Sequence, residues 1–434
     1  MDSNLNLFNK KHENKFRFKI HLKMSKRNDC RLCGGKDVIC FLSLSSMPRA
    51  GAYLKKEDLS KPEISYPLDV YFCKTCCSVQ LFDVIPREIL FDDYRYLSSA
   101  ASKSVLDHFD SYAREIRDSL TNQSSFVVEI ACNDGILLKP LKDLGVNCLG
   151  VDPDPNSVKV AREKGLEVIN DFFGKKVSCD IKKKFLPADV IIANAVFAHV
   201  DDMDDLTAGI TTLLADDGIF IFEIHHLTDI IEELQYDSIY HEHFSYHSII
   251  TLSIFLKKHG MDIYDVKKFS VRGGMIRVYA KKSTNTHRKI SQSVTEVLEL
   301  EKKFGLDKIE TFMKFGENVM KHKSEILALL NKLKLEGKKI VAYGMSGRGN
   351  TLLNFWNVGT NIIEYGIDAS PARYNRYVPG MHIPIISPEN ALDDADYALL
   401  LAWVFKDDIM KKEKKFIENG GKFIIPMPTP HFEP

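Results

Sequence analysis

Four cysteines form two Cys-x-x-Cys pairs, a spacing that is typical of metal binding. The first pair is Cys30 and Cys33, and the second is Cys73 and Cys76. Each pair can present two thiolates to one ion, so two pairs complete the tetrahedral coordination that zinc prefers. A site of four thiolates has no open position, which predicts a structural zinc ion. Cys77 is a weaker candidate ligand beside them.

A second candidate site follows a short apolar run at residues 126–130. The next residues, 131–135, read Ala-Cys-Asn-Asp-Gly, a tight turn from which a helix begins near Ile136. Backbone amides at such a turn can contact a ligand, and Asp152, at the end of the next apolar run, can bind ribose hydroxyls. The full Gly-x-Gly-x-x-Gly of a dinucleotide site is missing. The pattern therefore favours S-adenosylmethionine over NAD, with a generic turn as the alternative.

The densest group of ionisable residues is at 239–247, which reads Ile-Tyr-His-Glu-His-Phe-Ser-Tyr-His. Histidines two residues apart do not share one helical face, which disfavours a metal site on a helix. A neutral histidine that removes a proton, oriented by a glutamate, is a coherent alternative. A buried hydrogen-bond network or a surface cap would also fit. His199 follows the apolar run at 188–193 and is a weaker candidate for the same cleft.

A glycine-rich turn at 343–351 follows another short apolar run. It reads Tyr-Gly-Met-Ser-Gly-Arg-Gly-Asn-Thr. Backbone amides and a helix N-terminus suit a pyrophosphate, and Arg348 adds positive charge. The Lys-Ser/Thr order of a P-loop is missing, so this turn does not predict a P-loop nucleoside triphosphatase.

These sites must be positioned by alternating helices and strands, which predict an α/β fold with parallel sheets. We expect a small N-terminal zinc-binding domain, a central doubly wound Rossmann-like methyltransferase domain and a second Rossmann-like α/β domain at the C-terminus. The expected ranges are a flexible tail at 1–29, then domains at 30–104, 105–288 and 289–434.

Composition excludes several classes of protein. The 434 residues include 59 Lys plus Arg and 59 Asp plus Glu, so the formal net charge is zero, whereas a protein that binds nucleic acid usually has a basic excess. No apolar run is long enough to span a membrane, and no apolar segment typical of a secretion signal is visible near the N-terminus. Nine cysteines without such a signal favour the reducing cytoplasm. We expect a monomer or a weak homo-oligomer.

Taken together, these motifs resemble the sugar C-methyltransferases that act on nucleotide-linked 4-keto-deoxyhexoses. The resemblance extends from Cys30 over nearly the whole chain. It includes both cysteine pairs, the turn at 129–135, the run at 198–200 and the cluster at 240–246. Further matching segments are 93–99, 347–354 and 379–385.

The resemblance implies a methyl transfer to the carbon next to the ketone, C3 of the sugar. His243 would be the general base, with Tyr240, Glu242, His199 and Tyr94 lining the site. S-adenosylmethionine would be held by the following residues: Glu129, Ala131, Asn133, Gly135, Asp152 and Asn194. The nucleotide diphosphate of the sugar would be held by these: Ser346, Gly347, Arg348, Asn350 and Thr351.

Two other functions fit parts of the sequence. A methyltransferase could use its zinc knuckles to grip RNA, although the acidic residues Glu57, Asp58, Glu63 and Asp69 between the knuckles disfavour it. A non-catalytic protein that senses nucleotide sugars is the second alternative. It would bind the sugar without turnover, and His243 would be dispensable.

Overall fold

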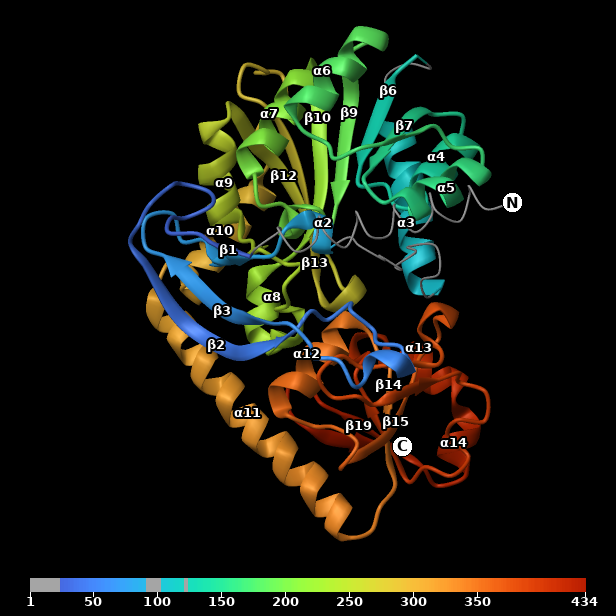
Figure 1. The fold of residues 1–434 in the computed structure, drawn as a ribbon. Helices are drawn as coiled ribbons and strands as arrows, with labels where there is room; N and C mark the ends of the chain where they lie inside the picture. Colours follow the sequence, from blue (N-terminus) through green and yellow to red (C-terminus); the bar gives the residue numbers. More distant parts are fainter. Residues whose placement is uncertain (1–23, 91–102, 121–123) are drawn as a thin grey trace, which may run out of the picture.

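A computed structural model describes residues 24–90, 103–120 and 124–434. Figure 1 shows two α/β units, one above the other, with the N-terminal strands running along their junction. The long helix α11 (Ile309–Leu335) lies along the outside of the lower unit. Tyr94 and the rest of the 93–99 motif lie outside the described residues.

The N-terminal strands form a small antiparallel sheet in the order β11-β4-β3-β2. Its strands are β2 (Val38–Pro48), β3 (Ser65–Cys73), β4 (Val79–Leu81) and β11 (Ser245–Tyr246). β11 belongs to the segment 239–247, called the histidine cluster below. This sheet is therefore completed by a strand more than 160 residues downstream of β4. A further pair joins β1 (Ser25–Lys26), the end of the stretch expected to be a flexible tail, to β5 (Asp83–Val84). The short helix α2 (Arg87–Leu90) follows.

The upper unit contains a seven-stranded sheet in the order β12-β13-β10-β9-β6-β7-β8. The strands from β10 to β8 are parallel, and β13 is antiparallel to both neighbours. The strands are β6 (Phe126–Ile130), β7 (Asn147–Asp152), β8 (Val168–Asn170), β9 (Ala188–Asn194), β10 (Leu214–His225), β12 (Met261–Phe269) and β13 (Met275–Lys282). The expected Rossmann-like fold of the central domain is therefore confirmed.

Helices cover both faces of this sheet, because alternate residues of its strands point to opposite sides. Val127 packs with α3 (Lys103–Ser119) and α4 (Leu138–Asp143) on one face. Val128 belongs to the core on the other face, with α6 (Lys175–Lys184), α7 (Met203–Leu213) and α9 (Ile249–Lys258). The remaining helices of this unit are α5 (Pro155–Glu163), α8 (Leu227–Glu232) and α10 (Gln292–Phe304).

The lower unit contains a second seven-stranded sheet, in the order β16-β17-β15-β14-β18-β19-β20. Its five central strands are parallel and its edge strands antiparallel. The strands are β14 (Ile340–Tyr343), β15 (Ile363–Ile367), β16 (Arg376–Tyr377), β17 (Pro384–Ile386), β18 (Tyr397–Leu400), β19 (Lys422–Ile425) and β20 (His431–Glu433). The helices are α12 (Gly347–Trp356), α13 (Lys406–Lys412) and α14 (Lys414–Glu418), besides α11. This confirms the expected second α/β domain.

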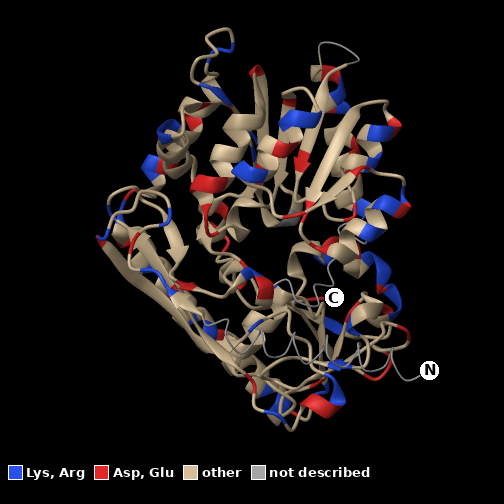
Figure 2. Cartoon of the chain, turned by 45° about the horizontal axis from the view of Figure 1, so that its top comes forward, with Lys and Arg blue, Asp and Glu red and all other residues tan. Residues whose placement is uncertain are grey.

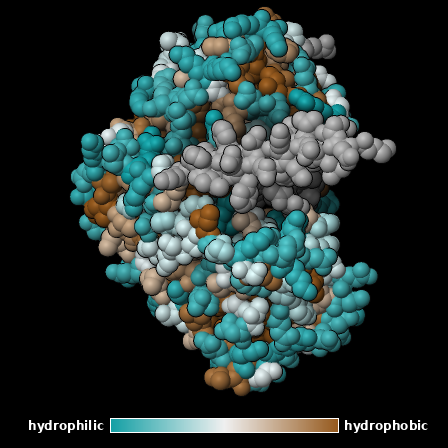
Figure 3. All heavy atoms as spheres, viewed as in Figure 1, coloured by the Kyte–Doolittle hydropathy of each residue, from teal (hydrophilic) through white to brown (hydrophobic). Residues whose placement is uncertain are grey.

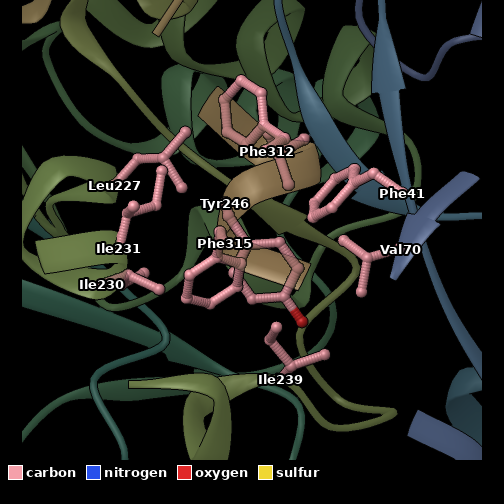
Figure 4. A pocket seen from close by; sticks show the side chains of 10 residues that line it. Phe41, Val70, Leu227, Ile230, Ile231, Ile239, Tyr246, Phe312 and Phe315 are labelled. Carbon is pink, nitrogen blue, oxygen red and sulfur yellow. The ribbon is translucent and has the colours of Figure 1, made fainter. Parts of the chain in front are cut away.

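One continuous apolar core joins the N-terminal sheet, α8, α11 and the lower sheet. Figure 4 shows a small apolar cavity within it, where side chains from the N-terminal sheet, α8, α11 and the 239–246 segment face one another. Its lining includes Phe41, Leu227, Ile239, Tyr246, Phe312 and Phe315. Ile239 and Tyr246 belong to the histidine cluster, so the core fixes that segment against the N-terminal sheet and α11.

The surface carries charges of both signs. Figure 2 shows basic and acidic residues interspersed along the outer helices, and the face seen in Figure 3 is largely hydrophilic with scattered apolar patches. Among the described residues, no helix combines the length and the apolar composition that crossing a membrane requires.

Candidate functional site

The four paired cysteines come together in one cluster. The sulfurs of Cys30 and Cys76 are 3.5 Å apart, those of Cys33 and Cys73 are 3.6 Å apart, and the four sulfurs all lie within 4.8 Å of one another. Such a set can surround one tetrahedral ion, so the geometry fits the predicted structural zinc site. Cys77, the weaker candidate, is not part of the cluster.

The two cysteine turns have the same local geometry. In the first, the amide of Gly34 donates to the carbonyl of Cys30 (2.8 Å); in the second, the amide of Cys77 donates to that of Cys73 (2.8 Å). Gly34 and Cys77 both adopt positive φ, +71° and +60°. Cys77 therefore occupies the corner of the second turn that glycine occupies in the first.

Neighbouring donors support the sulfurs. Gln80 donates through Nε2 to Cys30 Sγ at 3.0 Å, and the amide of Gly35 donates to Cys33 Sγ at 3.3 Å. Four thiolates exceed the charge of one zinc ion, so donors to sulfur stabilise the bound state. Cys30, Cys73 and Cys76 belong to the same apolar core as the methyltransferase sheet, which anchors the knuckles to that unit.

The turn after β6 has the shape needed for close approach to a ligand. Ala131, Asn133 and Gly135 all have positive φ. A Cβ added to Gly135 would lie 2.1 Å from Leu166 Cδ1, so a side chain here would have to displace Leu166 on a backbone whose φ is +86°. The amide of Asn133 donates to Asp152 Oδ2 at 2.8 Å, which ties the turn to the end of β7. Burial raises the pKa of Asp152 to about 6.

Polar atoms without partners mark the same strand ends. Among the described residues, Glu129 Oε2 and both side-chain amide atoms of Asn194 make no hydrogen bond of normal geometry, although Asn194 lies close enough to Glu129 to oppose the rise in its pKa. Burial, with the nearby Asp152, raises the pKa of Glu129 well above its usual value. Buried polar groups normally have partners, so these atoms fit a polar ligand such as the adenosine and amino-acid parts of S-adenosylmethionine.

The histidine cluster forms a compact group around His243. The ring centroid of His243 lies 4.1 Å from that of Tyr240, 4.7 Å from that of His199 and 6.4 Å from that of His225. His199 belongs to a 3-10 helix (Phe197–His199) just after β9. The structure thus brings His199 and His243 together, as the sequence predicted.

A backbone contact fixes the tautomer of His243. Its Nδ1 lies 2.7 Å from the carbonyl oxygen of Ser238, at the end of the 3-10 helix Tyr236–Ser238. Because a carbonyl oxygen only accepts, Nδ1 must donate. In the neutral ring, Nε2 then carries a free lone pair and can accept a proton.

Burial keeps these histidines neutral. The ring of His243 is buried, and its pKa is lowered well below 6.5, first by burial and then by His199 and His225. Burial also lowers the pKa of His199 to about 4. In contrast, burial raises the pKa of Glu242 to about 7, against the opposing effect of Arg49. The site therefore holds a neutral histidine that is next in sequence to a carboxyl whose pKa lies near neutral pH.

The glycine-rich turn of the lower unit meets this cluster. Ser346 caps α12 by accepting the amide of Gly349 through Oγ at 3.4 Å. A Cβ built on Gly347 would lie 3.9 Å from Tyr240 Cε2 and 3.7 Å from Ala50 Cβ. Asn350 is buried and donates to the carbonyl of Ala50, so the start of α12 touches both the N-terminal segment and the histidine cluster.

Two residues predicted to bind the diphosphate have protein partners. Arg348 makes a two-point ion pair with Asp237, with nitrogen–oxygen distances of 2.9 and 2.8 Å. The Thr351 side chain is buried, and its hydroxyl donates to the carbonyl of Gly347 at 3.2 Å. Contact of either side chain with a substrate stays a prediction.

Sequence reasoning missed three residues at the site. His225 ends β10, and the strand-end argument that pointed to His199 could have found it. Asp237 and Ser238 carry no such signal, because their roles depend on contacts with Arg348 and with the ring of His243.

Family models match three successive parts of the chain. A model described as "Putative zinc binding domain" matches residues 30–91, one described as "Methyltransferase domain" matches residues 105–266, and one described as "C-methyltransferase C-terminal domain" matches residues 270–428. Together they cover all three of the parts that carry the sites above.

Similar proteins match most of the chain or a smaller part of it. C-methyltransferase NovU of Streptomyces niveus is 34% identical over 406 residues, which cover 93% of this chain and 96% of the relative. Ubiquinone biosynthesis O-methyltransferase of Methylobacterium nodulans is 30% identical over 27% of this chain and 46% of the relative. A crystal structure of the glycopeptide N-methyltransferase MtfA with S-adenosyl-L-methionine is 15% identical, covers 40% of this chain and 93% of that chain, and has a TM-score of 0.32.

Proposed function

Because the chain belongs to the C-methyltransferase family, we propose that it methylates the carbon next to the ketone of a nucleotide-linked 4-keto-deoxysugar, with S-adenosylmethionine as methyl donor and His243 as general base. The observation that carries this proposal is the buried, neutral ring of His243, whose Nε2 is left free to accept a proton by the contact of Nδ1 with Ser238. The site lies where the strand ends of the upper unit meet the glycine-rich turn of the lower unit.

The ligand sites converge on this base from two sides. Asn194 ends β9 and precedes the His199 segment, so a cofactor at that strand end lies on the same side as the histidines. Gly347 borders Tyr240, so a nucleotide diphosphate at α12 would extend its sugar toward His243. Two bound ligands aligned in this way make the transfer effectively intramolecular.

The cofactor would be held by the turn after β6, with Asp152 accepting from its ribose and Asn194 contacting its polar atoms. When bound there, S-adenosylmethionine supplies an electrophilic methyl group on a positively charged sulfur, to which the bonding electron pair returns on transfer. The zinc site lies among four cysteines with no open position, so it has no role in the chemical step.

The residues around the base carry the proton transfer. His243 Nε2 takes the proton from the carbon next to the ketone, and the electron pair of that C–H bond moves onto the ketone oxygen as an enolate. Tyr240 and the protonated form of Glu242 can donate hydrogen bonds where that charge develops. The enolate carbon then forms the new bond to the methyl group.

Purified, zinc-loaded protein incubated with S-adenosylmethionine and a panel of nucleotide-linked 4-keto sugars tests the proposal. We expect mass spectrometry to find one sugar that gains a single methyl group. Protein that binds a sugar of the panel without methylating any of them would contradict the proposal and would favour a sensor of nucleotide sugars.

The pH dependence of turnover should reflect the buried base. Since the pKa of His243 is lowered well below 6.5, its ring stays neutral as the pH falls through 6.5, and activity persists there. Loss of activity through protonation of the base should begin only at lower pH. Measuring kcat/KM against pH checks this, and an acid limb centred at or above 6.5 would contradict it.

Gly135→Ala should weaken cofactor binding by about tenfold or more, equivalent to roughly 1.4 kcal/mol. The new methyl would meet Leu166 and distort the turn. Gly145→Ala is a matched control, because Gly145 has a similar φ of +78° and no atom within 4 Å of an added Cβ. Isothermal titration with S-adenosylmethionine measures the effect; equal affinity of the two variants would argue against cofactor binding at this turn.

A further inference from the structure

Arg31 lies between the first two zinc ligands, and its side chain is completely buried. Its guanidinium donates to the carbonyl of Phe244 at 2.9 Å, to the carbonyl of Leu81 at 3.1 Å and to Asp201 Oδ1 at 3.0 Å. A buried arginine is costly unless its donors and its charge are satisfied. Here those demands are met by groups from three separate segments, so Arg31 holds the segments together.

Two of those segments carry the histidines of the site. Phe244 directly follows His243, and Asp201 lies two residues after His199. The amide of Phe244 also donates to the carbonyl of Ala198 at 2.6 Å. Arg31 therefore binds the segment that follows His243 and the segment that follows His199, close to the point where the two segments contact each other.

Gln80 connects Arg31 to the first cysteine turn, Cys30–Cys33. Its Oε1 accepts the amide of Arg31 at 2.8 Å, and its Nε2 donates to Cys30 Sγ at 3.0 Å. In the sheet, Gln80 is also paired with Ser245 of β11, two residues after His243. Hydrogen bonds thus link the first cysteine turn to the segment that carries His243.

We propose that Arg31 is a positioning residue that holds His199 and His243 in their reactive arrangement from the zinc-binding knuckle. The inference rests on the proposed function, since it takes His243 as the base. It gives the zinc site a second role: besides stabilising the fold, the site sets the position of the base. A shift of about 1 Å in a reacting group can cost on the order of 100-fold in rate.

Arg31→Lys tests the proposal, because lysine keeps the charge but cannot reach three partners with one planar group. We expect kcat to fall by about tenfold to 100-fold, with the KM for the sugar, the Kd for S-adenosylmethionine and the zinc content within about twofold of the original protein's. Peptides covering 238–246 should exchange amide hydrogen faster.

Arg27→Gln is the matched control. Arg27 also pairs with Asp201, at 3.2 Å, and with Asp29, but among the described residues its side chain makes no hydrogen bond to Phe244 or Leu81. Its loss should leave kcat and the exchange of 238–246 unchanged. Should Arg31→Lys fail to fold, Asp201→Asn is the second variant, because the half-exposed Asp201 side chain is the charge partner of Arg31. We expect this variant to lower kcat with KM unchanged.

The possible outcomes separate this inference from the proposed function. If the original protein methylates a sugar and a folded, zinc-loaded Arg31→Lys variant keeps its kcat and its exchange pattern, Arg31 does not position the base. If kcat falls only together with zinc content and cofactor affinity, its role is structural, and the proposal is also overturned. If the original protein methylates no sugar, the proposed function itself fails.

Discussion

Replacing His243 by asparagine is expected to lower kcat by roughly 10²- to 10⁴-fold, the usual contribution of a general base. Asparagine can keep a donor toward the carbonyl of Ser238, but it has no lone pair that accepts a proton at neutral pH. Affinity for S-adenosylmethionine should change little, because the turn after β6 lies on other elements. Steady-state kinetics and isothermal titration measure the two quantities.

His259→Asn is the control for this change, since His259 lies at the end of α9 and pairs with Asp204. It should retain full activity. Should His243→Asn lose cofactor affinity together with activity, the ring would have a structural role and the assignment of the base would be wrong.

The second large effect is expected from the metal site. Cys73→Ser leaves zinc one thiolate short, and loss of a structural metal ligand belongs to the few changes that cost about 4 kcal/mol or more. We expect a lower zinc content and a lower melting temperature. Elemental analysis and thermal unfolding measure both.

Cys77→Ser is the matched control for the metal site. Cys77 is next to a ligand, but its sulfur is outside the cluster, so zinc content should be unchanged. A Cys73→Ser variant that holds zinc and melts like the original protein would show that these four cysteines do not bind the metal.

The elements that the sequence predicted best are those specified by short, local patterns. The apolar run at 126–130 forms β6, and the glycine-rich turn leads into α12 as expected. The two cysteine pairs, Cys30–Cys33 and Cys73–Cys76, also come together in one cluster, as expected. In these cases residue type and spacing determine the local geometry, because buried strands need apolar runs and knuckle turns need closely spaced thiols.

The contacts that position the base could not be predicted in the same way. β11 pairs with β4 across more than 160 residues, and Arg348 pairs with Asp237 across 111. Arg348 was therefore expected at a phosphate, since a single sequence does not reveal a distant carboxylate partner. The tautomer of His243 depends on a backbone carbonyl, which every residue has and no sequence pattern distinguishes.

Hydrogen exchange at the substrate carbon tests the central claim most directly. With S-adenosylhomocysteine in place of the methyl donor, the protein is incubated in D₂O with the nucleotide sugar that it methylates, and NMR follows the proton next to the ketone. We predict that the original protein replaces this proton by deuterium and that His243→Asn does so no faster than buffer. Equal exchange by both proteins would show that another group removes the proton.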